Sequence, residues 1–270
     1  MIMHDMFSLK DKVAVVTGAL GLLGRNHCIA LCEAGASVVV ADMHEQKCTD
    51  FATKYLENSI GVYLDVTRKE SILELMNIVL QKYGRIDILV NNAAINDMFE
   101  DPKAATDQSK FENYPLELWQ QSIDVNLTGV FLCSQVIGPQ MVEQKNGSII
   151  NIASTYGVTA PDQSIYIDQQ GSQSFFKPPA YSVTKGGVII LTKYLAAYWG
   201  TTGVRVNTLT PGGIKNAQND FFIKNYSSKT PLGRMAEPTD YQGAIVFLAS
   251  DASAYMTGAN LIVDGGWTCW

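Results

Sequence analysis

The stretch from Lys12 to Gly24, KVAVVTGALGLLG, decides the fold of this chain. Its first half is a run of β-branched residues, and its second half places Gly18, Gly21 and Gly24 in front of an apolar helical pattern. Glycines at such a junction allow a tight turn and let backbone N–H groups approach a pyrophosphate at the N-terminus of the helix. The stretch therefore predicts a strand, a phosphate-binding turn and a helix, as at the start of a dinucleotide-binding sheet.

The same alternation of short β-branched runs and longer helical patterns continues to the end of the chain. We expect helices at 22–35, 44–58, 68–83, 115–137, 180–200 and 238–250, and strands at 12–18, 37–42, 60–66, 86–94, 147–154, 204–211 and 260–266. Strands that are apolar along their whole length are typical of a parallel sheet covered by helices on both faces. The sequence thus predicts an α/β fold, a single Rossmann-type, doubly wound domain over residues 1–270 with a parallel sheet of about seven strands.

Two polar, aperiodic stretches interrupt this alternation, residues 96–114 and residues 157–179. Long loops inside compact α/β domains are usually functional or disordered. Both stretches follow strands at the carboxyl edge of the expected sheet, where such sheets bind ligands. We therefore expect both insertions to lie near the ligand.

The overall composition excludes several classes of protein. The 270 residues are 47% apolar and 17% charged, and the formal net charge is −6, which argues against a nucleic-acid surface. No run reaches the roughly 18 apolar residues of a membrane span, and the first residues lack the pattern of a signal peptide. Five cysteines without framework spacing suit reduced thiols in the cytoplasm, and three scattered histidines give no expectation of a metal site.

An acidic residue ends the second expected strand. Asp42 follows Gly24 at nearly the offset of about 20 residues at which a carboxylate meets the adenosine ribose hydroxyls. Such a carboxylate repels a 2′-phosphate, and no arginine occurs in ADMHEQ (41–46), so NAD is expected rather than NADP. Asp42 could instead cap the next helix, and Asp65 could either cap a helix or approach the adenine.

The stretch YSVTK (181–185) places a tyrosine and a lysine four residues apart at the start of an expected helix. Residues at this spacing lie on one helix face, so their head groups can converge on one small volume. The spacing alone is equally consistent with two ordinary amphipathic residues. The rest of the chain has to distinguish a proton-transfer pair from a surface pattern.

That distinction comes from an ordered set of motifs. They are TGALGLLG (17–24), DV (65–66), NNAA (91–94), VN (125–126), IAS (152–154), YSVTK (181–185), NTLTPGG (207–213) and VDGG (263–266). Carrying these motifs in this order, the chain resembles the short-chain dehydrogenase/reductase family over essentially its whole length. The resemblance implies a nicotinamide-dependent oxidoreductase of the single-domain type.

The resemblance also assigns roles to four residues. Tyr181 is implied to be the general acid/base, Lys185 to lower the tyrosine pKa and bind the nicotinamide ribose, Ser154 to hydrogen-bond the substrate oxygen, and Asn126 to hold a water in a proton relay. General chemistry agrees, because a free tyrosine with a pKa of about 10 is a poor base at neutral pH and a nearby ammonium favours its phenolate. Taken alone, Ser154 could simply start a turn, and Asn126 could be a buried amide that satisfies backbone groups.

The motifs further predict the residues that line the ligand site. The expected cofactor-binding residues are Gly18, Gly21, Leu22, Leu23, Gly24, Asp42, Met43, Asp65, Val66, Asn92, Ala93, Ala94, Tyr181, Lys185, Pro211, Gly212 and Ile214. The expected substrate residues are Thr155, Tyr156, Tyr166 and Gly213.

Three departures from the family pattern stand out. The glycines are spaced GxxGxxG rather than GxxxGxG, which shifts the middle glycine by one position. Ser154 and Tyr181 are farther apart than in most members, so the inserted segment must loop out for their hydroxyls to meet. Ala94 replaces the glycine that usually ends the NNAG motif.

The insertion bears on the substrate. Tyr156, Gln163, Tyr166, Asp168 and Gln173 offer hydrogen-bonding groups beside aromatic faces, which suits a polyhydroxylated ligand better than a steroid or acyl chain. The insertion, LTKYLAAYWG (191–200) and FFIKNYSSKTPLGRMAEP (221–238) look similar to short-chain enzymes of bacterial surface-sugar and flagellin-glycan pathways. We therefore expect a sugar or sugar-acid substrate. An epimerase or dehydratase that retains NAD, and a non-catalytic NAD-binding protein, are the alternatives.

The resemblance also implies a homo-oligomer, either a tetramer or a dimer, built through the helices near 115–137 and 180–200 and the C-terminal strand region. Trp267 and Trp270 could pack at such an interface or close the core of one subunit.

Overall fold

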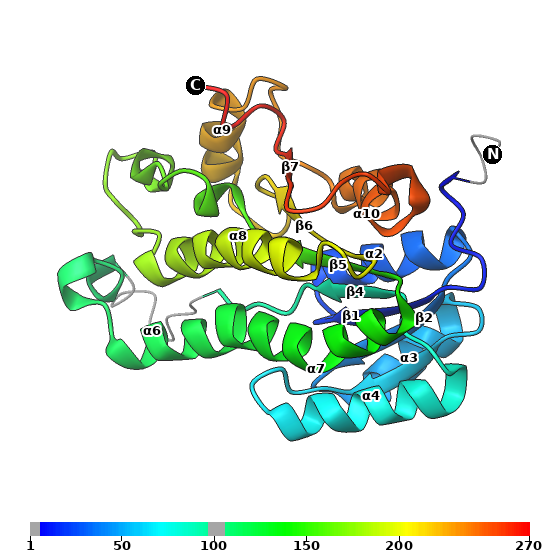
Figure 1. Cartoon of the computed structure of the whole chain (residues 1–270). Coiled ribbons are helices and arrows are strands. Elements are labelled where there is room, and N and C mark those ends of the chain that lie inside the picture. The colour runs from blue at the N-terminus through cyan, green and yellow to red at the C-terminus, as the bar shows by residue number, and fades with distance from the viewer. Residues whose placement is uncertain (1–5, 97–105) are drawn as a thin grey trace.

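Within the described part of the chain, seven parallel strands form one sheet at the centre of the molecule. The computed structural model describes residues 6–96 and 106–270. The strands are β1 (Val13–Thr17), β2 (Ser37–Asp42), β3 (Ile60–Tyr63), β4 (Ile88–Asn91), β5 (Gly147–Ile152), β6 (Val204–Pro211) and β7 (Asn260–Val263). Their order is β3-β2-β1-β4-β5-β6-β7, and all neighbours are parallel. The order reverses between β1 and β4, which confirms the predicted doubly wound sheet (Figure 1).

Helices cover both faces of this sheet. They are α2 (Leu22–Glu33), α3 (Glu45–Tyr55), α4 (Lys69–Tyr83), α6 (Leu116–Ile123), α7 (Gly129–Gln144), α8 (Pro179–Trp199), α9 (Asp220–Ser228) and α10 (Gln242–Ala249). One face packs against α2, α3 and α10, and the other against α4, α7 and α8 (Figure 1). Along β1, Ala14 and Val16 belong to the first of these cores and Val13 and Val15 to the second. The strand is therefore apolar at every position because both of its faces are buried.

Several predicted strands run past the observed ends. The predictions at 60–66, 86–94, 147–154 and 260–266 extend two or three residues beyond the carboxyl ends of β3, β4, β5 and β7. Residues just after the strands, such as Leu64 and Ala153, are still buried, so the apolar pattern continues where the ladder of hydrogen bonds has stopped. These extra residues turn into the loops at the carboxyl edge of the sheet.

The predicted helix at 115–137 is interrupted. A π-helical turn, η2 (Asp124–Thr128), separates α6 from α7 and contains the buried residue Asn126. π-Helical turns often occur at functional sites because the extra residue redirects a side chain. By length and composition the helical segment from Leu116 to Gln144 could cross a membrane. However, half of its most apolar 18-residue window is buried inside the domain, where α7 packs on α4 and β5. We therefore assign it to the core.

The insertion at 157–179 folds as an ordered unit. It contains the short helix η4 (Gln163–Tyr166) and an antiparallel bridge between Ile167 and Gln173. The hydroxyl of Thr106 donates to the carbonyl of Ser174 over 2.7 Å, so the insertion touches the described part of the other predicted loop. Residues 97–105 of that loop lie outside the described residues.

Helix α9, which the sequence pattern did not predict, holds the insertion from the other side. The side-chain amide of Asn225 donates to the carbonyls of Ile165 and Ile167, at 3.3 Å each. Lys229, just after α9, forms an ion pair with Asp162. The insertion and α9 are thus tied together above the carboxyl edge of β5 and β6 (Figure 1).

Candidate active site

A cavity of about 630 Å³ opens along the carboxyl edge of the sheet. Asp42 and Asp65 line it after β2 and β3, and Ser154 lines it after β5. Neighbouring strands lie about 4.8 Å apart, so the four spacings from β3 to β5 place these ends about 19 Å from one another. The cavity therefore crosses the point where the strand order reverses, the position at which doubly wound sheets bind dinucleotides.

The glycine turn shapes one wall of this cavity. Gly18 has φ of +60°, and a Cβ there would lie 2.6 Å from Cα of Ala93, so no other residue fits. Gly21 lines the cavity and caps α2 without any side-chain hydrogen bond. The free N-terminus of α2 therefore suits a pyrophosphate. Gly24 does not line the cavity; a Cβ there would lie 2.3 Å from the Gly18 carbonyl oxygen, so it allows the helix to pack under the turn.

Two carboxylates stand at the β2–β3 end. Asp42 accepts hydrogen bonds from the backbone N–H of Leu20 over 3.0 Å and of Met43 over 2.8 Å. His44, not Asp42, occupies the N-cap position of α3, so the alternative in which Asp42 caps that helix is wrong. Asp65 accepts from the N–H and the hydroxyl of Thr67, at 2.9 and 2.7 Å, and thus forms a turn before α4. Both carboxylates face the predicted adenosine end.

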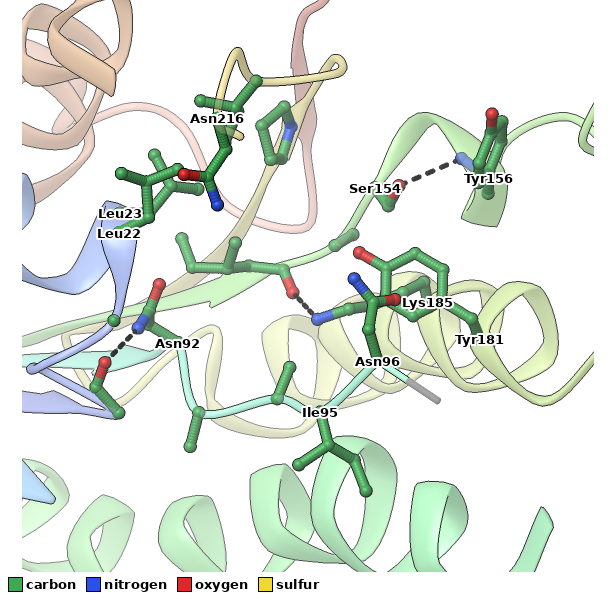
Figure 2. A pocket seen from close by; sticks show the side chains of 18 of the residues that line it. Leu22, Leu23, Asn92, Ile95, Asn96, Ser154, Tyr156, Tyr181, Lys185 and Asn216 are labelled. Atoms are coloured by element: carbon green, nitrogen blue, oxygen red, sulfur yellow. Dashed lines mark hydrogen bonds between the residues drawn. The ribbon is translucent and has the colours of Figure 1, made fainter. Parts of the chain in front are cut away.

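Hydrogen bonds from the NNAA motif connect the end of β4 to the glycine turn. The side-chain amide of Asn92 donates to the carbonyl of Thr17 over 3.0 Å. It also donates to the carbonyl of Gly18 over 2.9 Å (Figure 2). The backbone N–H groups of Asn92 and Ala93 both donate to the hydroxyl of Thr17 over 3.0 Å. Ala94 lines the cavity beside them. The motif therefore fixes the relative position of β1 and β4 beneath the ligand site.

Ser154, Tyr181 and Lys185 come together at the other end. Ser154 and Tyr181 both line the cavity, and the hydroxyl of Ser154 accepts from the N–H of Tyr156 over 3.2 Å (Figure 2). The ammonium of Lys185 lies 5.8 Å from the ring centroid of Tyr181 and donates to the carbonyl of Ile152 over 2.7 Å. The insertion at 157–179 loops out between Ser154 and Tyr181, as the long spacing requires.

Burial changes the acidity of this pair. Burial raises the pKa of Tyr181, and the neighbouring side chain of Ser154 opposes that rise. Burial also lowers the pKa of Lys185 to about 8. Both shifts disfavour the charged form, as expected for groups removed from water. The phenol is therefore neutral and the amine mainly charged near pH 7, a suitable state for an acid that acts next to a cation.

Asn126 does not line the cavity. Its side-chain carbonyl accepts from the N–H of Ile95 over 2.8 Å, and its amide donates to the carbonyl of Ile95 over 3.0 Å. This buried amide therefore satisfies a backbone segment, which is the second of its two sequence interpretations. Ile95 and the next residue, Asn96, both line the cavity near Tyr181 (Figure 2). Asn126 thus positions the loop at the reacting end.

An aromatic wall closes the substrate end. Tyr166 of the insertion lies 5.4 Å from Phe222 of α9 and 5.3 Å from Phe175, measured between ring centroids. Tyr226 stacks on Trp267 at 4.1 Å, and its hydroxyl accepts from the N–H of Gly213 over 2.5 Å. Trp267 therefore closes the core of one subunit, whereas Trp270 is 81% exposed. Tyr156, Tyr166, Gly213 and the buried Thr155 all line the cavity, as predicted.

Three residues expected to contact the substrate instead stabilise the insertion. Gln163 exchanges hydrogen bonds with the backbone of Lys177, at 2.8 and 3.2 Å. Gln173 donates to the carbonyls of Gln163 and Phe175, and Asp168 accepts two N–H groups of its own turn. None of the three lines the cavity, so that prediction was wrong. A loop needs such internal partners because its backbone is not paired in a sheet.

The cavity also contains residues that the motifs do not reach. They are Leu64, Thr67, Ile95, Asn96, Lys177, Asn216, Gln218, Phe222, Tyr226 and Met235. Most lie in the insertion or on and around α9, whose short apolar pattern in FFIKNY was the only sequence signal.

All of the remaining predicted cofactor residues line the cavity. They are Leu22, Leu23, Met43, Val66, Pro211, Gly212 and Ile214. A Cβ at Gly212 would lie 2.8 Å from Cα of Asp264, so the loop after β6 passes close to the loop after β7. The glycine turn, the uncapped helix and the carboxylate at the ribose position together fit a nicotinamide dinucleotide.

Comparison with known proteins shows relatives that are similar over nearly the whole chain. The model of a family described as enoyl-(acyl carrier protein) reductase matches residues 18–268. An NAD-dependent glycerol dehydrogenase from Listeria innocua is 32% identical over 267 residues, which cover 97% of this chain and 96% of the relative. A 3-alpha-(or 20-beta)-hydroxysteroid dehydrogenase from Mycobacterium tuberculosis is 35% identical over 258 residues, 96% of this chain and 90% of the relative.

A solved structure is also similar to this chain over its whole length. The crystal structure of a gluconate 5-dehydrogenase from Burkholderia cenocepacia J2315, in complex with NADP and tartrate, is similar to this chain with a TM-score of 0.87. The two sequences are 29% identical, and the match covers 100% of both chains.

Proposed function

Because the chain belongs to the short-chain dehydrogenase/reductase family, oxidoreductases that act on alcohol and ketone groups with a nicotinamide cofactor, we propose that it interconverts a hydroxyl and a carbonyl group of a sugar or sugar acid with NAD. One observation carries this proposal. Ser154, Tyr181 and Lys185 converge at one end of a cavity whose opposite end has the glycine turn and Asp42. The hydroxyl pair marks the position of the reacting oxygen.

Each of these side chains has a defined task in the proposed reaction. Tyr181 gives a proton to the substrate oxygen during reduction and takes it back during oxidation. Ser154 hydrogen-bonds the same oxygen, and the ammonium of Lys185 favours the phenolate form of Tyr181. NAD, when bound, supplies the hydride acceptor. The glycine turn, Asp42 and the loop after β6 would hold it.

The polar character of the substrate end supports a polyhydroxylated substrate. The polar residues Tyr156, Thr155, Asn96 and Asn216 line the cavity beside aromatic residues. A relative named as a hydroxysteroid dehydrogenase is as similar in sequence as the glycerol dehydrogenase, so overall identity does not separate the two substrate classes. The polar residues of the lining support the polyhydroxylated class, since a steroid favours a slot without them.

The test is a turnover assay with the native protein. Nicotinamide absorbance is followed with NAD, and separately with NADP, across neutral polyols, sugars, sugar acids, aliphatic alcohols and steroids. Turnover of a polyhydroxylated compound with NAD is the expected result. Turnover of only aliphatic or steroidal alcohols would refute the substrate class. Conversion of a sugar without net change of the cofactor would instead support the epimerase alternative, which the GxxGxxG spacing mildly favours.

We expect Asp42 to set the preference for NAD. The native protein should favour NAD over NADP by about 100-fold in kcat/KM, because a carboxylate near a 2′-phosphate is repulsive. Asp42→Ala should narrow this ratio by about tenfold or more, an effect of about 1.4 kcal/mol. The comparison is made with Asp65→Ala, whose carboxylate lines the cavity after β3 rather than β2. A native preference for NADP would contradict the proposal.

We also propose self-association through α8. Val183, Ile190, Tyr194 and Tyr198 lie on one face of this helix and are 50 to 68% exposed. The rings of Tyr194 and Tyr198 stack at 6.1 Å and form a flat apolar surface. Such a surface suits a second copy of the chain, since large apolar patches on soluble proteins usually mark interfaces.

The double substitution Tyr194→Glu and Tyr198→Glu should reduce the oligomer to a smaller species, because it buries unpaired charges in the proposed interface. Sedimentation velocity measures the change. Tyr55→Glu, at a 56% exposed tyrosine of α3, is the matched control and should leave the assembly intact. A native monomer would contradict the proposal.

The cytoplasm is the compartment that we propose. All five cysteines are free, and Cys28, Cys48 and Cys133 are buried as thiols. Thiols in this state suit a reducing compartment.

A further inference from the structure

Charge is divided between the two ends of the cavity. Among the described residues that line it, the carboxylates are Asp42 and Asp65, both at the β2–β3 end. The ammonium groups are Lys177 and Lys185, both at the Tyr181 end. Lys185 already has a place in the proposed chemistry. Lys177 does not, although the cavity brings it to the reacting end.

The backbone of Lys177 is held rigidly. Its N–H donates to the side-chain carbonyl of Gln163 over 2.8 Å, and its carbonyl accepts from the side-chain amide of Gln163 over 3.2 Å. Pro178 follows directly and precedes α8. The insertion therefore delivers this lysine to a fixed position. Preorganisation of this kind lowers the entropic cost of binding a ligand.

The ammonium of Lys177 lies over the ring of Tyr181. It lies 4.2 Å from the ring centroid of Tyr181 and donates to the side-chain carbonyl of Asn96 over 2.7 Å. The hydroxyl of Tyr181 is attached to that same ring and faces Ser154 (Figure 2). One small substrate can therefore place an oxygen at the hydroxyl pair and another group at the ammonium.

We propose that Lys177 recognises the carboxylate of the substrate and so makes the enzyme selective for a sugar acid over the neutral polyol of the same length. This inference rests on the proposed function and specifies its substrate class. An ammonium forms charge-assisted hydrogen bonds with a carboxylate, which are about twice as strong as neutral ones.

The experiment uses aldonates of four to six carbons, each paired with the alditol of the same length. In the native protein, kcat/KM for at least one aldonate should exceed that for its alditol by about tenfold or more. Lys177→Met keeps the apolar stem and removes the charge. It should lower kcat/KM for the aldonate by about 10- to 100-fold, mainly through KM, and leave the alditol within about threefold.

Lys82→Met is the matched control. Lys82 also lies over a tyrosine ring, at 5.6 Å from the centroid of Tyr83, but outside the cavity. This variant should retain the native preference. An equal loss of both substrates in Lys177→Met would mean that the lysine only packs against Tyr181, and would overturn the inference. A preference for aldonates that survives in Lys177→Met would also overturn it.

Calorimetry separates this inference from the proposed function. The same aldonates are titrated into the native protein and Lys177→Met in the presence of NAD. If no compound is turned over, the proposed function fails, and binding still decides the inference. Aldonate binding that is weakened about tenfold or more in Lys177→Met supports it. No aldonate binding, or equal binding by both proteins, overturns it.

Discussion

Tyr181→Phe should lower kcat by about 10²- to 10⁴-fold, the range in which a positioned acid/base contributes to a reaction. The substitution removes the hydroxyl of Tyr181, which lines the reacting end of the cavity together with Ser154. The ring remains, so its contacts with the ammonium groups of Lys177 and Lys185 are kept. NAD affinity, measured by calorimetry, should therefore stay within about threefold of the native value.

The pH profile gives this prediction a second readout. Oxidation needs Tyr181 as a proton acceptor, so native kcat/KM should rise with pH until the phenolate form dominates. Burial raises the pKa of Tyr181, which places this rise on the alkaline side in the absence of ligand. The residual activity of Tyr181→Phe should lack the rise. Tyr83→Phe, which removes a hydroxyl bonded to the Asn58 carbonyl outside the cavity, is the control. Activity within about threefold of native in Tyr181→Phe would contradict the assignment.

The fold could be predicted from the sequence because its signals are local and repeated. Each strand such as β2 is a short β-branched run, and each helix such as α4 has its own period. Strand ends were less accurate, because residues such as Leu64 stay buried after the ladder has ended. The π-helical turn at Asn126 could not be predicted, since one extra residue in a turn leaves the apolar pattern almost unchanged.

Some residues of the site could likewise be predicted from the sequence, and others could not. Gly18 carries a signal in its residue type, because only glycine fits φ of +60° against Ala93. Lys177 and Tyr226 carry no such signal, since their position depends on how the insertion and α9 fold against one another. The error at Gln163 has the same origin. A polar residue in a long loop serves either the ligand or the loop, and only the fold decides between them.

The second large effect is expected at Lys185, where activity and stability should change in opposite directions. Lys185→Met should lower kcat by about 10²-fold or more, because the phenolate of Tyr181 loses the ammonium 5.8 Å from its ring. The native side chain is only 3% exposed. Burial lowers its pKa from 10.5 to about 8, so keeping it charged at neutral pH costs about 3 kcal/mol of folding free energy. Methionine has a similar volume and no charge.

The variant should therefore unfold at a higher urea concentration than the native protein at pH 7. Loss of the hydrogen bond to the Ile152 carbonyl reduces this gain in unfolding free energy by about 1 kcal/mol. Lys185→Met is then more stable than the native protein by about 1 to 2 kcal/mol. Between pH 8 and 10.5 the unfolded lysine holds more protons than the folded one, so native stability rises and the difference shrinks. Lys193→Met, at an exposed lysine of α8, should show no such pH dependence. If the variant is less stable than the native protein at pH 7, Lys185 contributes to packing. If the variant is more stable but has lost turnover, the buried charge is kept for the chemistry of Tyr181.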